Sequence, residues 1–398
     1  MKRRFHGLLF VPSLAGLLLV SGWTGWAAVR DVPLPASGAL STDLRATGFG
    51  LFNEPAVPRS SAVDVDRYEG RFELRPDFRI EYPALRLTAK PRLGLGYVER
   101  YSGPGDMYDT EAEGYLNEAV LRLSLRDELF LHGGRENLQW GPSQLVSLSN
   151  PFNPSNGRDD PARELAGMDF VRAVWVPRTM WALSLIANVG EGRAEWLDPR
   201  GPFERIYAAK LDYTGMGHYA SLVGSIREKD DADATLGGYA GINAGEATLL
   251  YVEGNVPPET DRFQTLVGGS YTFIWSGMLS LEYLHNGGGA RDGDLPPLPD
   301  MSCRECKELP EIPEVGAFAR KNYLFLQYYD SYRDRTDVTV RLTYGLDDES
   351  GRLTGIVWHA LNDYLSAFAV AHVEEGGEGA EFERILRGSI TAGLSASY

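Results

Sequence analysis

The segment between residues 133 and 177 concentrates charged side chains that could hold or filter a charged solute. Its arginines and carboxylates are nearly balanced, and Pro151 and Pro154 follow asparagines, a pairing that favours turns and stiffens the chain. If the segment folds into a pore, opposite charges create a field that orients polar solutes. The alternative is that these charges form only salt bridges holding a loop to the wall. The sequence predicts a constriction formed by Arg135, Glu136, Arg158, Asp159, Arg163 and Glu164.

Three more arginines, Arg122, Arg126 and Arg341, lie on the polar face of segments that alternate polar and apolar residues. In residues 119–126, for example, leucines occupy every second position and the arginines lie between them. A period of two indicates a β-strand with one apolar and one polar face. We expect these arginines to line the wall of a water-filled lumen, which the long charged loop enters.

The two cysteines, Cys303 and Cys306, lie in a polar, proline-rich stretch spanning residues 287–313. A Cys-x-x-Cys pair outside the cytoplasm could be redox-active or supply half of a zinc site. No histidine lies close to the pair in sequence, since the nearest is His285. A local disulfide in a surface loop is the interpretation that we favour.

No motif in the sequence predicts a catalytic centre. The six histidines are scattered and form no HExxH pair, and we find neither a GxSxG motif nor a convincing Ser/His pairing. Carboxylate pairs such as Asp159-Asp160 are expected in solvated loops. We therefore expect no metal, no cofactor and no enzymatic activity.

The first 27 residues have the features of a secretory signal peptide. Lys2, Arg3 and Arg4 precede an apolar stretch from Leu8 to Val20, and small residues follow up to Ala27. Its cleavage would remove three basic and no acidic residues, which lowers the formal net charge from -16 to -19. So acidic a chain is not expected to bind nucleic acid, because phosphate binding needs concentrated Lys and Arg.

The rest of the chain has the pattern of an antiparallel β-barrel. From about residue 63 it alternates polar and apolar residues in segments of roughly ten, which are rich in Gly and aromatic residues. Tight turns alternate with long polar connections at residues 102–113, 141–167 and 287–320. We predict an all-β transmembrane barrel of about 16–18 strands over residues 63–398. Residues 28–62 would form a first strand, with residues 43–53 as its core, or a periplasmic or lumenal segment. A soluble β-sandwich would bury the apolar faces instead.

The last strand ends on an aromatic residue. Ile390, Leu394 and Tyr398 fall on one face of an alternating segment, and the sequence stops at Tyr398. This segment resembles the final strand of bacterial outer-membrane barrels, which the insertion machinery reads. The resemblance implies a location in the outer membrane and makes these residues a predicted insertion signal.

The charged segment contains a Gly-Arg pair, a Trp-Gly turn, an Asn-Pro element and an Arg/Pro/Glu run. These residues are Gly134, Arg135, Trp140, Gly141, Asn150, Pro151, Arg158, Pro161, Arg163 and Glu164. With them the segment resembles a family of uncharacterised porin-like outer-membrane barrels. The resemblance implies a porin-like barrel in the outer membrane, in contact with lipid and lipopolysaccharide, and it supplies no substrate. From the expected barrel size and the charges of its lumen and loop we predict a channel for passive passage of small polar or charged solutes, and a homo-oligomer is possible. A plugged surface or assembly protein is the alternative, and an outer-membrane enzyme is a weaker one. Alginate-export-type porins are a more distant comparison.

Overall fold

The computed structural model describes residues 32–34, 38–61, 63–103, 107–156, 163–192, 203–228, 233–258, 260–291, 295, 318–377 and 379–398. The predicted signal peptide, two of the predicted constriction residues (Arg158 and Asp159) and both cysteines lie outside these residues. No helix within the described ranges combines the length and the hydropathy needed to cross a membrane.

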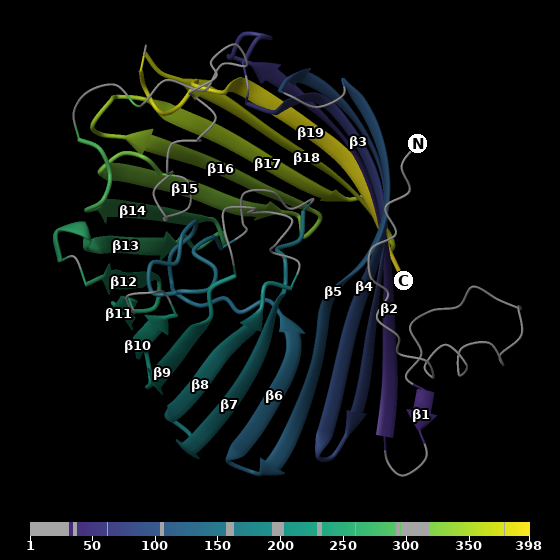
Figure 1. Ribbon diagram of the computed structural model, residues 1–398, viewed down its shortest axis with the longest axis vertical. Coiled ribbons are helices and arrows are strands. Elements are labelled where there is room, and N and C mark those ends of the chain that lie inside the picture. The colour runs from purple at the N-terminus through teal and green to yellow at the C-terminus, as the bar shows by residue number, and fades with distance from the viewer. Residues whose placement is uncertain are drawn as a thin grey trace, which may run out of the picture.

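Eighteen antiparallel strands, β2 to β19, form one closed barrel (Figure 1). Each strand pairs with the next, and β19 pairs with β2, with Ile390 opposite Phe52. The predicted fold class is confirmed, and the number of strands is the upper value of the predicted range. A short strand, β1, pairs with the beginning of β2. The strands are β1 (Val32–Leu34), β2 (Gly38–Pro55), β3 (Val65–Tyr82), β4 (Leu85–Ser102), β5 (Tyr108–Arg126), β6 (Leu129–Glu136), β7 (Met168–Arg178), β8 (Trp181–Gly190), β9 (Ile206–Thr214), β10 (His218–Arg227), β11 (Asp233–Asn243), β12 (Thr248–Val256), β13 (Gln264–Thr272), β14 (Met278–Asn286), β15 (Asn322–Tyr332), β16 (Thr336–Gly345), β17 (Gly351–Ala360), β18 (Leu365–Glu375) and β19 (Leu386–Ser397).

The barrel exposes apolar side chains outward and encloses polar ones. On β14, Leu281 is 50% exposed, whereas its neighbour Glu282 is 1% exposed. Other strands repeat this alternation, with exposed Leu, Val and Ile residues on one face and buried Ser, Thr, Glu and Arg residues on the other. A soluble sandwich would bury its apolar face, so this arrangement fits a barrel that is surrounded by lipid and filled with polar groups.

Long and short connections lie at opposite ends of the barrel, because they alternate along an up-and-down chain. Residues 83–84, 127–128 and 179–180 are tight turns, whereas residues 137–167 and 287–321 connect strands at the other end. Short periplasmic turns and longer outer loops are typical of outer-membrane barrels.

The prediction of a long loop at residues 102–113 is wrong for the second half of that segment. Residues 108–113 belong to β5 and pair with β4, with Glu113 opposite Gly94 and Glu111 opposite Gly96. Apart from Tyr108, the residues that alternate with these glutamates are Thr110 and Ala112, which are small, so this part of β5 has few of the large apolar residues that predict a strand. Glycines on the partner strand leave space beside the two glutamates.

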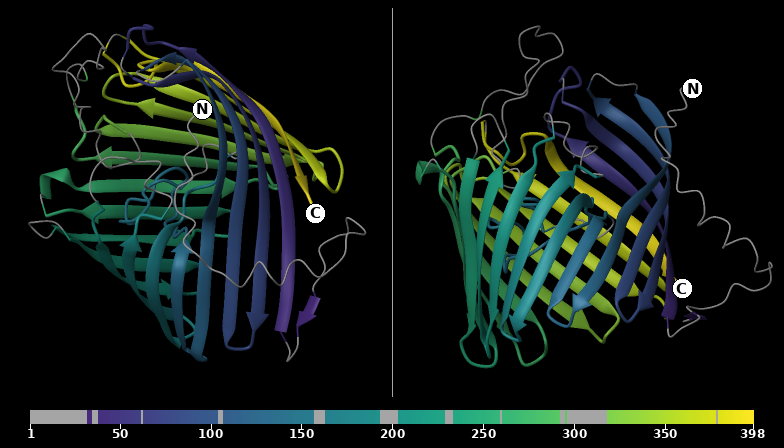
Figure 2. Two further views of the ribbon diagram at one scale, coloured as in Figure 1. Left: turned by 45° about the vertical axis from the view of Figure 1, so that its right-hand side comes forward. Right: turned by 60° about the horizontal axis from the view of Figure 1, so that its bottom comes forward.

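Strands β2 to β5 are much longer than the others, as Figure 2 shows along one side of the barrel. They contain 18 or 19 residues, against 8 in β6 and 12 in β19. A tilted strand needs only about 9–11 residues to cross a bilayer. These four strands therefore continue beyond the membrane.

The ladder between β3 and β4 is interrupted at its centre. Pairing stops after Leu74 opposite Leu93 and resumes at Phe78 opposite Ala89, and the gap holds Pro76 and Pro91. Proline has no N–H to donate to a ladder. The Arg92 guanidinium donates to the carbonyl oxygens of Pro76 and Pro91 at 3.1 and 2.9 Å. One side chain thus binds two carbonyl groups that the interrupted ladder leaves available.

The end of the chain closes the barrel. The backbone of Tyr398 exchanges hydrogen bonds of 2.9 and 3.0 Å with that of Leu44, and its ring stacks on Tyr364. Ile390, Leu394 and Tyr398 are all exposed on the outer surface. Their role as an insertion signal stays a prediction.

The two faces of β16 provide a test of this orientation. Val340 is 43% exposed on the outer face, and the preceding Thr339 lies on the opposite face. Replacing Val340 with Arg should destabilise the barrel by about 2–4 kcal/mol, because the charge would enter the lipid. Thr339→Arg is the matched control and should cost much less. Urea unfolding of the refolded protein in lipid vesicles measures both, and equal losses would contradict the assigned faces.

Candidate channel constriction

The connection between β6 and β7 runs into the interior of the barrel (Figure 1). Its described residues contact strands far from its own ends. Its first part, residues 137–156, reaches a fully buried carboxylate on β12, Glu253. The Ser147 hydroxyl and the Ser149 hydroxyl and N–H donate to one oxygen of Glu253 at 2.9, 2.6 and 2.9 Å. We call residues 137–167 the inner loop.

A second buried carboxylate, Glu282 on β14, binds the same part of the inner loop. It accepts hydrogen bonds from the Gln144 N–H at 2.8 Å and, more weakly, from the Ser143 hydroxyl at 3.4 Å. Tyr251 of β12 donates to it at 2.6 Å. The two carboxylates therefore accept a set of loop N–H and O–H donors, and this is how β12 and β14 position the loop.

Apolar side chains of the inner loop also pack against the wall. One group, which includes Leu145 and Leu148, contacts the side of the wall that carries Leu266, Leu284 and Tyr323. A second group, Leu138 and Phe152, contacts Phe170, Ile186, Ile206 and Ala208 on β7 to β9. Apolar burial and hydrogen bonds together hold the loop against two parts of the barrel.

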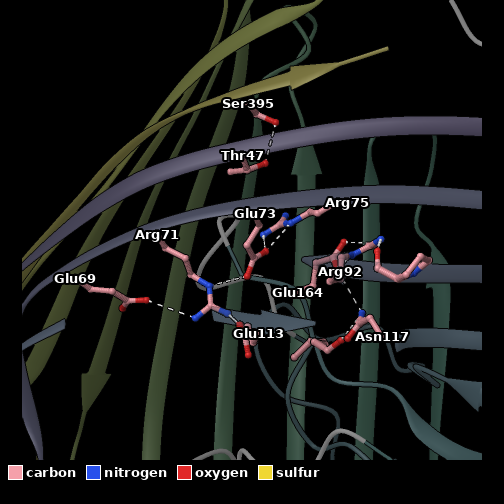
Figure 3. Close-up of polar contacts among 12 residues, drawn as sticks. Thr47, Glu69, Arg71, Glu73, Arg75, Arg92, Glu113, Asn117, Glu164 and Ser395 are labelled. Carbon is pink, nitrogen blue, oxygen red and sulfur yellow. Dashed lines mark hydrogen bonds and ion pairs between the residues drawn. The ribbon is translucent and has the colours of Figure 1, made fainter. Parts of the chain in front are cut away.

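The end of the inner loop binds a third part of the wall, as Figure 3 shows. Glu164 accepts hydrogen bonds from Arg92 of β4 at 2.6 and 3.0 Å, and from Asn117 of β5 at 3.4 Å. Arg163 forms an ion pair with Glu69 of β3. Arg92 also binds Asp77 at 2.8 Å, so one buried arginine joins the loop to the interrupted ladder.

Strand β3 carries a charge series that our sequence analysis did not identify. Glu69, Arg71, Glu73 and Arg75 occupy alternate positions and share the inner face (Figure 3). Glu73 accepts from Arg71 at 2.6 Å and from Arg75 at 2.8 Å, and Arg71 also pairs with Glu113. The signal was present in the sequence, because the residues between these charges include Phe72 and Leu74.

The structure separates two predicted constriction residues that are adjacent in the sequence. Glu136 lies on the inner face of β6 and accepts from Arg172 at 3.0 Å. Arg135 binds Asp169 at 2.8 Å. Phe170, the next residue on β7, is buried against the inner loop. Neighbours on a strand point to opposite faces, so Asp169 and its partner Arg135 lie on the outer face. Of the six predicted residues, the described ones on the lumen side are Glu136, Arg163 and Glu164.

The predicted wall arginines also differ in their surroundings. Arg122 lies on the inner face of β5, with its guanidinium 4.3 Å from the centre of the Phe130 ring. Arg341 is buried on β16 and donates to Gln327 at 2.9 Å. Arg126 is exposed at the end of β5, beside the turn.

Sequence reasoning also missed a Ser/His pair. His372 of β18 and Ser389 of β19 are direct cross-strand partners, and the Ser389 hydroxyl lies 3.1 Å from the His372 ring. The two lie in a row with Thr354 and Asn53 on the neighbouring strands. Within the described part of the chain, no group of three or more His, Cys, Asp or Glu residues could hold a metal ion.

The ion pair of Glu164 makes this end of the loop sensitive to pH. Burial tends to raise the pKa of Glu164, but hydrogen bonds and charge from Arg92, with Arg75 and Lys90 nearby, bring this pKa below its ordinary value of 4.5. A carboxylate whose pKa is lowered by its partners stabilises the folded arrangement at pH values above its ordinary pKa. That contribution is lost as the pH falls through the lowered value.

We predict that the end of the inner loop starts to loosen below about pH 4.5, the ordinary pKa of a glutamate, and detaches as the pH falls through the lowered pKa of Glu164. Glu164→Gln should detach it at pH 7 as well and remove most of the pH dependence. Limited proteolysis of the membrane-inserted protein between pH 7 and pH 3 measures the release. A variant that stays protected at pH 7 would show that Glu164 does not hold the loop.

Comparisons with known proteins agree on the fold and do not show a family. No protein-family model matches the sequence, and no curated protein matches it significantly.

Solved structures similar to this one include the outer-membrane porins OccK5 (OpdH) and OprD of Pseudomonas aeruginosa. OccK5 has a TM-score of 0.54 at 9% identity, covering 90% of this chain and 97% of that one. OprD has a TM-score of 0.50 at 13% identity, covering 94% and 98%. The capsule-assembly protein Wzi of Escherichia coli, a carbohydrate-binding β-barrel, has a TM-score of 0.54 at 11% identity, covering 88% and 83%. At these identities the likeness shows that the chain has the fold of an outer-membrane β-barrel.

Proposed function

We propose that the protein is a porin-like channel through which small polar or charged solutes pass passively across the outer membrane. The observation that carries this proposal is the inner loop, which contacts β12 and β14 on one side and β3 to β5 on the other. A loop that is held at both ends and crosses the charged interior narrows the lumen of the barrel. Barrels in this size class are wide enough to hold an aqueous channel.

The constriction that we propose differs from the predicted set in one respect. Glu136, Arg163 and Glu164 stay in it because they lie toward the lumen, and Arg158 and Asp159 stay in it as part of the same loop. Arg135 is replaced by the charges of β3, because its partner Asp169 lies on the outer face. Opposite charges on loop and wall then orient a solute as it passes.

The proposal also includes the other features expected from the sequence. Residues 1–27 would direct export and be removed, Tyr398 would be read by the insertion machinery, and Cys303 and Cys306 would form a loop disulfide. Outer-membrane lipid and lipopolysaccharide would surround the barrel, which could form homo-oligomers. The resemblance to uncharacterised porin-like barrels, and more distantly to alginate-export-type porins, supports this proposal.

Two alternatives come from particular observations. Wzi, described as an outer-membrane protein involved in capsule assembly, shares the fold, so a plugged assembly or surface protein is the second candidate. The Ser389–His372 pair is the feature that an outer-membrane hydrolase would use. We propose that the protein is not an enzyme, because this pair belongs to a polar cross-strand row along the wall. Labelling of Ser389 by a fluorophosphonate probe would contradict that view.

Single-channel recording in planar bilayers tests the channel. The refolded protein should give stable conductance steps, and Glu253→Leu combined with Glu282→Leu should give larger ones. Each substitution removes an acceptor for buried loop donors, a loss of about 1–3 kcal/mol per site, so the loop should leave its position. Glu374→Leu is the matched control, since this buried glutamate binds Arg352 at 2.6 Å instead of the inner loop.

Two outcomes would count against the proposal. Heat-modifiable, membrane-inserted protein without any conductance would contradict the channel and favour the plugged alternative. Conductance that stays the same in the Glu253/Glu282 double variant would keep the channel, but it would show that the inner loop does not set its width.

A further inference from the structure

Three inward-facing side chains form a row across neighbouring strands beside the inner loop. Arg122 of β5 is the cross-strand partner of His132 of β6, and His132 is the partner of Arg172 of β7. Neighbouring strands lie about 4.8 Å apart, so the two arginines flank the histidine at roughly equal distances. Arg172 lies two residues along β7 from Phe170, against which the loop packs. A solute that passes the loop on this side meets the row.

The row has more hydrogen-bond donors than acceptors. Arg172 donates to Glu136 and to the Nδ1 atom of His132, both at 3.0 Å. The Nε atoms of Arg122 and Arg172 are buried, and neither has a hydrogen-bond partner among the residues that the structure describes. A buried donor without a partner is destabilising, as are like charges on adjacent strands.

His132 supplies a further donor. A guanidinium group has no acceptor, so the Nδ1 atom of His132 must accept the hydrogen bond from Arg172. We infer from this that the ring is neutral and carries its proton on Nε2. The row then presents only N–H groups at three successive positions.

Within the described ranges of the chain, no carboxylate forms an ion pair with Arg122. On its other side, Arg122 faces Arg86 of β4, which pairs with Glu81 at 2.6 Å. Glu136 is already bound by Arg172. The contact that the structure gives Arg122 is with the face of the Phe130 ring, which binds a cation without neutralising it.

We propose that Arg122, His132 and Arg172 bind the anionic oxygen atoms of a solute, a carboxylate or a phosphate group. Guanidinium groups bind both kinds of oxyanion through paired hydrogen bonds. Such a group beside His132 lies between the two arginines, offers acceptors to their guanidinium groups and reduces the repulsion between them. The chain has a formal net charge of -16, so its overall field favours cations, and this row gives the pathway a local preference for anions. The inference rests on the proposed channel and adds its solute class.

Reversal potentials across salt gradients of potassium chloride, acetate and phosphate test the row. Arg122→Gln is the first variant, because Arg122 pairs with no carboxylate among the described residues, so its loss leaves none of them unpaired. We expect the anion-to-cation permeability ratio to fall about tenfold, which corresponds to about 1.4 kcal/mol. A larger fall with acetate than with phosphate would identify the carboxylate as the group bound, and the reverse would identify phosphate.

Two further variants serve as checks. Arg172→Gln combined with Glu136→Gln removes the second arginine together with its carboxylate, and it should lower the ratio in the same way. Arg387→Gln is the matched control, because Arg387 is exposed at the loop end of the barrel and pairs with Glu383 at 3.3 Å. This control should leave the ratio unchanged. Heat-modifiability confirms that each variant folds.

A binding measurement separates failure of the row from failure of the channel. Inorganic phosphate added to the refolded protein in detergent should show a broadened ³¹P resonance, and Arg122→Gln should remove the broadening. Broadening without conductance would support the row and contradict the channel. If the protein conducts, but Arg122→Gln changes neither the permeability ratio nor the ³¹P line width, the proposed anion binding by the row is wrong.

Discussion

The rest of the structure depends on one constraint, which is that every backbone N–H and C=O inside a bilayer must be bonded within the protein. The pairing of β19 with β2 meets it by removing both edges of the sheet. Once the ladder is closed, side chains are not needed as hydrogen-bond partners of the backbone. Alternate side chains can therefore face lipid on one side and the lumen on the other. The exposed Leu281 beside the buried Glu282 is a direct result of that division.

The place where the ladder is interrupted is also where the wall binds the inner loop. Pro76 and Pro91 remove two donors from the centre of β3 and β4, and the carbonyl groups around them need other partners. The Arg92 guanidinium donates hydrogen bonds to these carbonyl groups. Arg92 is only 1% exposed, so its buried positive charge needs a negative partner. Glu164 and Asp77 balance it. A defect in the ladder therefore creates the need for the ion pair that holds the loop.

Much of the fold could be predicted from period-two alternation, but the side of the barrel on which a charge lies could not always be read. Strand segments with regular leucines, such as residues 119–126, were recognised. Residues 108–113 were not, because two of the three residues on their outer face, Thr110 and Ala112, are small. Arg135 and Glu136 were placed together because they are neighbours in sequence, yet neighbours on a strand point to opposite faces. Only the pairing of Arg135 with Asp169 and the burial of Phe170 assign the faces.

The partners of the loop charges could not be predicted at all, since they are distant in the sequence. Glu164 and Arg92 are 72 residues apart, and Ser149 and Glu253 are 104 apart. The two ends of the loop are also held by different chemistry. Neutral N–H and O–H groups bind Glu253 and Glu282, whereas ion pairs bind Glu69 and Arg92. Protonation of a carboxylate weakens an ion pair more than a hydrogen bond from a neutral donor, because the ion pair depends on both charges. The part of the inner loop nearest β3 and β4 is therefore the part that electrostatic conditions in the lumen can move, while the part at β12 and β14 stays in place.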